Sequence, residues 1–191
     1  MIKGAIFDMD GTIVDVTYDW KKIKKELQTG GEPILTYLEN LDEPEKTEKW
    51  HILERYEEQA TARAVLKEGM GKFLAFLKGK GIKKALVTNN SRKNVDFLLD
   101  KFKLSFDLVI SREAGLWKPS GAPFLHVLEN FGIHRKECCV VGDSHFDVKA
   151  AEEAGIERIF ILADERGKTN SIGGKAVGSV RELQQKIENL I

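Results

Sequence analysis

The sequence contains few cysteines, carries no net charge and has no long hydrophobic run. Its two cysteines, Cys138 and Cys139, are adjacent in an apolar run, so we interpret them as core residues of a cytoplasmic protein rather than a disulfide framework. Acidic and basic residues number 30 each, and this balance favours no polyanionic partner such as nucleic acid. The apolar stretches are too short to span a membrane, and the N-terminus lacks a signal-like region. We therefore expect no nucleic-acid or membrane partner.

Two common nucleotide-binding signatures are also missing. The sequence contains no GxGxxG pattern, and the segment IGGK lacks the spacing of a phosphate-binding P-loop. Nucleotide-binding interpretations therefore lose their main support. The polar segment at 164–175 is the one long stretch without a regular pattern, and we expect it to be a loop.

Short apolar runs alternate with helical patterns along most of the chain. This alternation predicts an α/β fold with a parallel sheet and helices on both faces, and the mostly apolar runs are typical of strands covered on both sides. Helical spacing recurs at Val95, Leu98 and Phe102, and Ser179 with Glu182 predicts the start of a last helix. The five predicted strands are Ile2 to Phe7, Ile82 to Val87, Leu108 to Ile110, Cys138 to Val141 and Arg158 to Ile161.

One segment interrupts this alternation. Residues 16–67 show helical spacing without a convincing strand, for example at Trp20, Ile23 and Leu27, with a break at Gly30-Gly31. We interpret this segment as a small all-helical domain inserted after the first strand. The predicted domains are a core formed by residues 1–15 and 68–191, and an insertion formed by residues 16–67.

Polar residues follow several of the predicted strands. Ligands of open α/β sheets bind at the carboxyl ends of the strands. Asp8 and Asp10 are two residues apart, so both side chains can project to the same side of the first strand. Carboxylates gathered in one site repel one another unless a cation neutralises them, and oxygen ligands favour a hard ion such as Mg²⁺. The other polar residues near predicted strand ends or helix starts are Thr88, Asn89, Lys118, Asp143 and Asp147.

Four motifs together resemble those of the haloacid dehalogenase-like hydrolase superfamily. They are FDMDGT, TNN, KPSGAPF and GDSHFDVKAAEEAG, in the expected order and spacing. The resemblance extends from Ile2 to about Ile161 and implies a Rossmann-like core. Many members carry a helical cap just after the first motif, where the predicted insertion lies. Among them, phosphoglycolate phosphatase-like proteins with a helical cap are the nearest in pattern.

The resemblance implies a role for each matching residue. Asp8 would be the nucleophile that forms an aspartyl-phosphate, and Asp10 the general acid and then the base. Thr88, the backbone N–H of Asn89 and Lys118 would hold the phosphate.

The resemblance also implies a metal site. Mg²⁺ would lie between Asp8, the backbone carbonyl of Asp10 and Asp143. Asp147 would belong to the metal shell or orient the lysine.

Each of these residues also has a purely structural interpretation. Asp8 and Asp10 could be turn or helix-cap carboxylates, and Thr88 could cap the helix that starts near Ser91. Asp147 could be a first-turn carboxylate favoured by the helix dipole. The lysine at position 118 could be an ordinary surface residue before a helix, since proline follows it.

The expected activity is Mg²⁺-dependent hydrolysis of a small soluble phosphomonoester. A carboxylate at Asp10 argues for phosphate chemistry, because dehalogenases of the superfamily lack it. A phosphomutase or pyrophosphatase on the same fold, and a non-catalytic binding or regulatory module, are the alternatives. We expect the helical cap to select the substrate, a small phosphorylated metabolite, with Gly30 and Gly31 forming a turn that reaches the site. The chain is expected to be a monomer or a weak dimer.

Overall fold

The structure is a computed structural model that describes residues 1–162 and 173–191 of the chain. Residues 1–15 and 65–191 form one compact unit, and residues 16–64 form a second. Most of the polar segment expected as a loop, residues 164–172, lies outside the described residues.

The first unit is built on a six-stranded parallel sheet whose strand order is β5-β4-β1-β6-β7-β8. Its central strands β1 and β6 are buried at every position, which explains why they read as continuous apolar runs. The predicted α/β fold with a parallel, Rossmann-like sheet is confirmed. The strands are β1 (Gly4–Phe7), β4 (Lys83–Val87), β5 (Leu108–Ile110), β6 (Cys138–Gly142), β7 (Ile159–Leu162) and β8 (Lys175–Val177).

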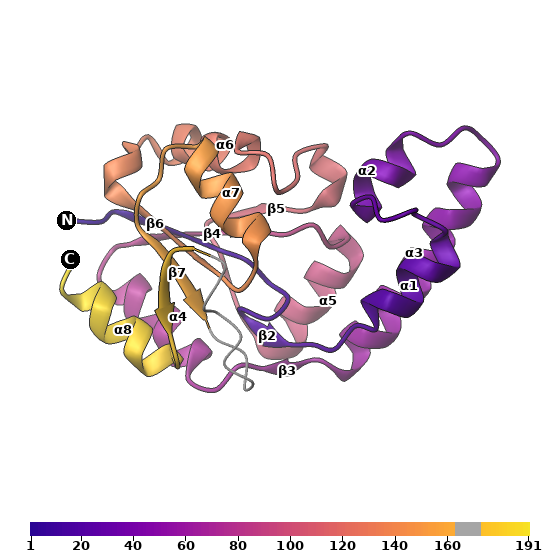
Figure 1. Cartoon of the computed structure of the whole chain (residues 1–191). Helices are drawn as coiled ribbons and strands as arrows, with labels where there is room; N and C mark the ends of the chain where they lie inside the picture. Colours follow the sequence, from indigo (N-terminus) through magenta and orange to yellow (C-terminus); the bar gives the residue numbers. More distant parts are fainter. Residues whose placement is uncertain (163–172) are drawn as a thin grey trace. The chain divides into compact units, whose positions relative to one another are not determined.

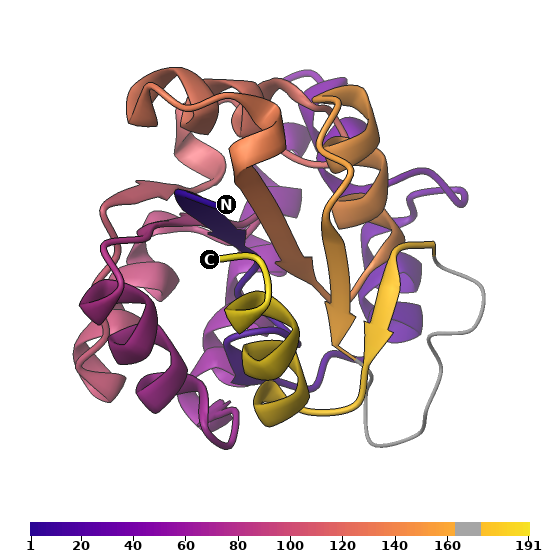
Figure 2. The same ribbon diagram turned by 90° about the vertical axis from the view of Figure 1, so that its left-hand side faces the viewer.

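Helices pack on both faces of this sheet. Helices α6 and α7 contact strands β1, β4 and β6 on one face, where Ile6 and Val140 join the core cluster with Phe124. Helices α4 and α8 pack together on the opposite face, and Figure 2 shows the two layers with the strands between them. The helices are α4 (Met70–Gly79), α5 (Arg92–Phe102), α6 (Ala122–Phe131), α7 (His145–Glu153) and α8 (Val180–Glu188), with two 3₁₀ turns at Arg112–Ala114 and Arg135–Glu137.

Three short strands were not predicted from the sequence. Strand β8 begins at Lys175, inside the segment expected to be irregular, and it pairs with β7. Strands β2 (Val14–Asp15) and β3 (Val65–Leu66) form a separate antiparallel pair, so the expectation that residues 16–67 contain no strand is wrong at its end. Strands β2 and β3 have only two residues each, and β8 begins with the exposed Lys175 and Ala176, so none of them forms an apolar run in the sequence.

The second unit consists of three helices, labelled α1 to α3 in Figure 1. Its core contains Ile23, Leu27, Leu38 and Leu53, each at most 1% exposed. The helical spacing of Trp20 with Ile23 and Leu27 predicts that all three pack inside the unit, but Trp20 is 47% exposed and stacks on the ring of Tyr18. That expectation is wrong for Trp20. The helices are α1 (Trp20–Leu27), α2 (Ile34–Glu39) and α3 (Glu45–Arg63).

A buried lysine ties these three helices together. The Lys49 ammonium of α3 donates to the carbonyl of Leu27 at the end of α1 and to the Tyr37 hydroxyl of α2, both at 2.7 Å. It also pairs with Glu45 at 3.0 Å, so the buried charge is fully engaged within the unit. Among the described residues, no helix is long and apolar enough to cross a membrane.

Candidate active site

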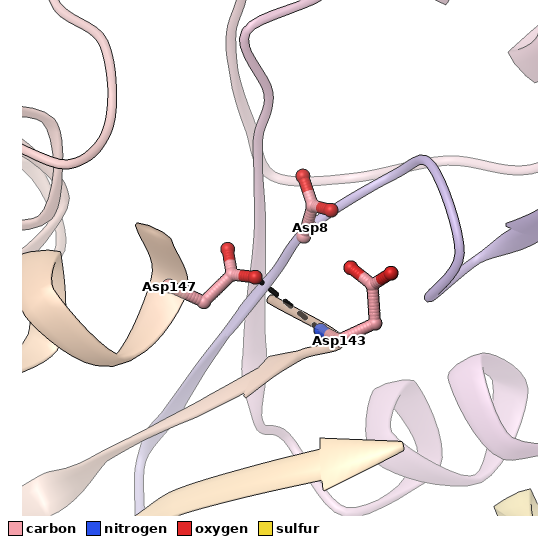
Figure 3. Close-up of side chains that lie close together, drawn as sticks. All are labelled: Asp8, Asp143 and Asp147. Carbon is pink, nitrogen blue, oxygen red and sulfur yellow. Dashed lines mark hydrogen bonds between the residues drawn. The ribbon is translucent and has the colours of Figure 1, made fainter. Parts of the chain in front are cut away.

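Three aspartates converge where strands β1 and β6 end. The two strands are parallel neighbours with Phe7 opposite Val141, so Asp8 and Asp143 leave the sheet side by side. Asp147 lies in the first turn of α7, which follows β6. One carboxylate oxygen from each of the three lies within 4.8 Å of the others, and Figure 3 shows the carboxylates gathered around one space. Three oxygen donors at this spacing fit a hard divalent cation.

Lys118 lies buried between two of these carboxylates. Its ammonium donates to an oxygen of Asp8 at 2.5 Å and to one of Asp147 at 2.6 Å. The residue is 4% exposed, so the interpretation of Lys118 as a surface lysine is wrong. The ammonium brings one positive charge into an otherwise acidic site.

Asp147 contacts Lys118 and also lies in the first turn of a helix, as two of the interpretations from the sequence predicted. One of its oxygens accepts from Lys118, and the other accepts from the backbone N–H and the hydroxyl of Ser144 at 3.0 and 2.7 Å. The second set closes a capping box at the start of α7. Asp147 is fully buried and therefore holds the lysine from a rigid helix end.

Burial and mutual repulsion raise the pKa values of two of the aspartates. Loss of hydration raises the pKa of Asp8 to about 7, against the attraction of Lys118 and with the repulsion of Asp147 and Asp10. Loss of hydration, followed by the charges of Asp8 and Asp147, raises the pKa of Asp143 to about 8. Burial alone would lower the pKa of Lys118, but the two carboxylates beside it raise that pKa overall. The lysine therefore stays charged, while the aspartates need more positive charge to be fully ionised.

Asp10 follows Asp8 by two residues, and an asparagine side chain holds its carboxylate. One of its oxygens accepts from the side-chain amide of Asn90 at 2.9 Å. Asn90 lies in the TNN motif, but sequence reasoning assigned it no role, because a spacing pattern does not tell which way an amide side chain points. Asn90 is 3% exposed and is the residue of this site that sequence reasoning missed.

Thr88 and Asn89 occupy the end of strand β4, next to β1. The Thr88 hydroxyl oxygen accepts from the backbone N–H of Asn90 at 3.1 Å, and its own proton can still be donated. Ser91 caps helix α5 by accepting from the N–H of Asn94, so the interpretation of Thr88 as the helix cap is wrong. The Asn89 side chain bonds to the backbone of Lys118, through both its oxygen and its nitrogen.

Two glycines allow the carboxylates to approach the backbone closely. Gly11 has a φ of +86°, and a Cβ there would lie 2.1 Å from an oxygen of Asp143. A Cβ on Gly142 would lie 2.4 Å from the carboxylate carbon of Asp147. Neither position has room for a side chain while the aspartates hold this arrangement.

Gly30 and Gly31 belong to the second unit and follow helix α1. Both have positive φ, +62° and +100°, and no atom lies within 4 Å of a Cβ placed on either. They therefore form a turn that depends on backbone freedom. Their part in substrate selection stays a prediction.

The chain is similar to known proteins over the region that contains these residues. Residues 5–161 match the family model of the haloacid dehalogenase-like hydrolases. The chain belongs to this family. An uncharacterized hydrolase of Saccharomyces cerevisiae is 31% identical over 202 residues, which cover 99% of this chain and 92% of that one. The phosphoglycolate phosphatase of Nitrosococcus oceani is 28% identical over 80% of each chain.

Solved structures of other proteins share the fold. The crystal structure of CbbY from Rhodobacter sphaeroides in complex with phosphate superposes with a TM-score of 0.74. The match covers 96% of each chain at 22% identity. The shared fold therefore extends over nearly the whole chain.

Proposed function

We propose that this hydrolase is a Mg²⁺-dependent phosphatase that acts on small phosphomonoesters through an aspartyl-phosphate on Asp8. The observation that carries the proposal is the buried Lys118 ammonium held between Asp8 and Asp147, with Asp143 beside them. This arrangement places a carboxylate nucleophile next to a fixed positive charge, which an anionic phosphoryl group requires. The relative named as a phosphoglycolate phosphatase supports the same reaction class.

In the proposed reaction, an oxygen of Asp8 attacks phosphorus and the bond from phosphorus to the leaving oxygen breaks. Asp10 donates a proton to that oxygen, so an alcohol leaves. Asp10 then takes a proton from water, which attacks phosphorus, releases inorganic phosphate and restores Asp8. In this proposal the phosphoryl oxygens are held by Lys118, by the hydroxyl of Thr88 and by the backbone N–H of Asn89.

The carboxylates fit the divalent cation that this reaction needs. Asp8 and Asp143 supply oxygen donors, and the carbonyl of Asp10 is the third proposed ligand. Loss of hydration, with the repulsion of neighbouring carboxylates, raises the pKa values of Asp8 and Asp143, and a cation between them would favour their ionised forms. When bound, Mg²⁺ would neutralise their negative charge and stabilise the charge that develops on the phosphoryl oxygens. Because Asp147 is occupied by Lys118 and Ser144, we assign it to positioning the lysine.

The three-helix unit is the proposed substrate-selecting cap. The phosphoryl group is recognised by residues of the first unit alone, so these residues cannot distinguish one organic leaving group from another. We therefore assign the choice among phosphorylated metabolites to residues 16–64. The turn at Gly30 and Gly31 is the proposed contact segment of this cap.

The proposed function is tested by phosphate release from p-nitrophenyl phosphate with Mg²⁺ and with EDTA. We expect turnover with Mg²⁺ and its loss in EDTA, because Asp8 and Asp143 then repel the anionic substrate. A panel of phosphorylated metabolites, with pyrophosphate and a hexose phosphate included, separates the phosphatase from a pyrophosphatase or a phosphomutase. A protein that binds phosphate esters without turning over any of them would be a non-catalytic module.

Replacing Asp10 with asparagine should slow reactions with poor leaving groups most. A p-nitrophenolate leaves with little help from an acid, whereas an alkoxide needs a proton. We expect kcat for an alkyl phosphate to fall by about 10³-fold, with a loss about tenfold smaller for p-nitrophenyl phosphate. Steady-state kinetics of both substrates measure this difference, and equal losses would mean that Asp10 is not the proton donor.

A further inference from the structure

The two asparagines that follow strand β4 bond to different parts of the site. The side chain of Asn89 contacts Lys118, whereas the side chain of Asn90 contacts Asp10. The two residues are adjacent in sequence and chemically identical. Their partners belong to different halves of the proposed reaction, one to phosphoryl binding and the other to proton transfer.

Asn89 holds the backbone of Lys118 at two points. Its amide nitrogen donates to the carbonyl of Lys118 at 2.8 Å, and its oxygen accepts from the N–H of Lys118 at 2.9 Å. This pair of bonds fixes the segment in the way that a neighbouring strand would. The two bonds thereby fix the backbone from which the Lys118 side chain extends to Asp8 and Asp147.

Only one orientation of the Asn90 amide satisfies Ser91, Asn94 and Asp10 together. Its oxygen accepts from the backbone N–H of Ser91 at 2.8 Å and from the amide of Asn94 at 2.9 Å. These two donors fix the oxygen on the side of helix α5, so the nitrogen must face Asp10. Asn90 and Asn94 are each 3% exposed, which keeps this network out of competition with water.

We propose that Asn89 and Asn90 are positioning residues with separate targets, Asn89 for Lys118 and Asn90 for the proton-transfer carboxylate Asp10. This inference rests on the proposed phosphatase function. The Asn90 amide donates to one oxygen of Asp10 and thereby orients the carboxyl group that transfers the proton. Asn89 acts on the lysine and has no bond to Asp10.

This division of roles predicts different responses to the same substitution. Asn90→Ala loosens Asp10 and should reproduce the pattern of Asp10→Asn in weaker form. We expect about a tenfold loss of kcat on an alkyl phosphate and little loss on p-nitrophenyl phosphate. Asn89→Ala keeps its backbone N–H but loosens Lys118, so we expect about a tenfold loss of kcat/KM on both substrates alike.

The experiment measures kcat and KM of both variants on both substrates, with thermal melts as a check on folding. Adding Asn90→Ala to the Asp10→Asn protein should cause no further loss of selectivity, because the residue through which Asn90 acts is already changed. If Asn90→Ala fails to fold, Asn90→Ser is used, since its hydroxyl can still accept locally from Ser91 but is too short to reach Asp10.

The outcomes separate this inference from the proposed function. Mg²⁺-dependent turnover and a leaving-group effect of Asp10→Asn establish the function independently of either asparagine. If those hold and Asn90 variants lose equally on both substrates, or Asn89→Ala shows the leaving-group effect, the division of roles is wrong. A wild-type protein without phosphatase activity would overturn both the function and the inference.

Discussion

Asp8→Asn is expected to lower kcat by about 10⁴-fold or more, because a neutral amide neither attacks phosphorus nor binds a cation well. The substitution should leave the fold intact. Lys118 keeps its second partner, Asp147, at 2.6 Å, and the buried carboxylate that is removed has a raised pKa. Phosphate release and a thermal melt of the same preparation test both statements.

A surface aspartate of the same unit provides the matched control. Asp100 on helix α5 pairs with Lys103, and its side chain is 83% exposed. Asp100→Asn makes the same chemical change without touching the site, and activity should remain at the wild-type level. Wild-type turnover in Asp8→Asn would remove this aspartate from the mechanism.

Asp143→Asn should stabilise the metal-free protein at about pH 8 while abolishing its response to Mg²⁺. A carboxyl whose pKa rises from 3.8 to about 8 on folding binds more protons in the folded than in the unfolded state between those values. Stability from this group is therefore present at low pH and is lost as the pH rises toward its folded pKa. Asparagine has no such proton to lose.

Thermal melts in EDTA and in Mg²⁺, at about pH 5 and about pH 8, measure this effect. In EDTA the melting temperature of the wild type should fall more between the two pH values than that of Asp143→Asn, by about 3 °C or more. Mg²⁺ should restore the wild type at the higher pH and leave the variant unchanged. Parallel pH curves for the two proteins in EDTA would contradict the raised pKa of Asp143, which results from burial and from the neighbouring carboxylates.

The sequence predicted the parts of the fold and site that depend on buried strands. Apolar runs such as those of β1 and β6 have no other stable place than the centre of a sheet, and the polar residues that follow them must meet at its edge. This is why Asp8 and Asp143 could be placed together before the structure was known. Lys118 follows no strand directly, and only the family resemblance assigned it to the same site. Their catalytic roles remain part of the proposal.

The parts of the fold and site that could not be predicted depend on features that leave no periodic pattern in the sequence. Strand β8 contains a lysine and an alanine and is defined by its neighbour β7, not by its own apolar character. Trp20 fits a helical stripe but stacks on Tyr18 at the surface. The direction of the Asn90 amide is set by Ser91 and Asn94, and such local bonds become visible only once the backbone is in place.

The short antiparallel pair β2–β3 has a consequence for how this protein could be engineered. The chain leaves the first unit after Asp15 and returns at Val65, and these two residues are direct partners in the pair. The inserted segment therefore begins and ends at two paired residues. Because the entropy of closing a loop grows slowly with its length, a longer or shorter insertion would change that entropy little. We therefore expect that residues 16–64 can be replaced by a tight hairpin turn, or by the corresponding segment of a relative, while the six-stranded sheet is retained.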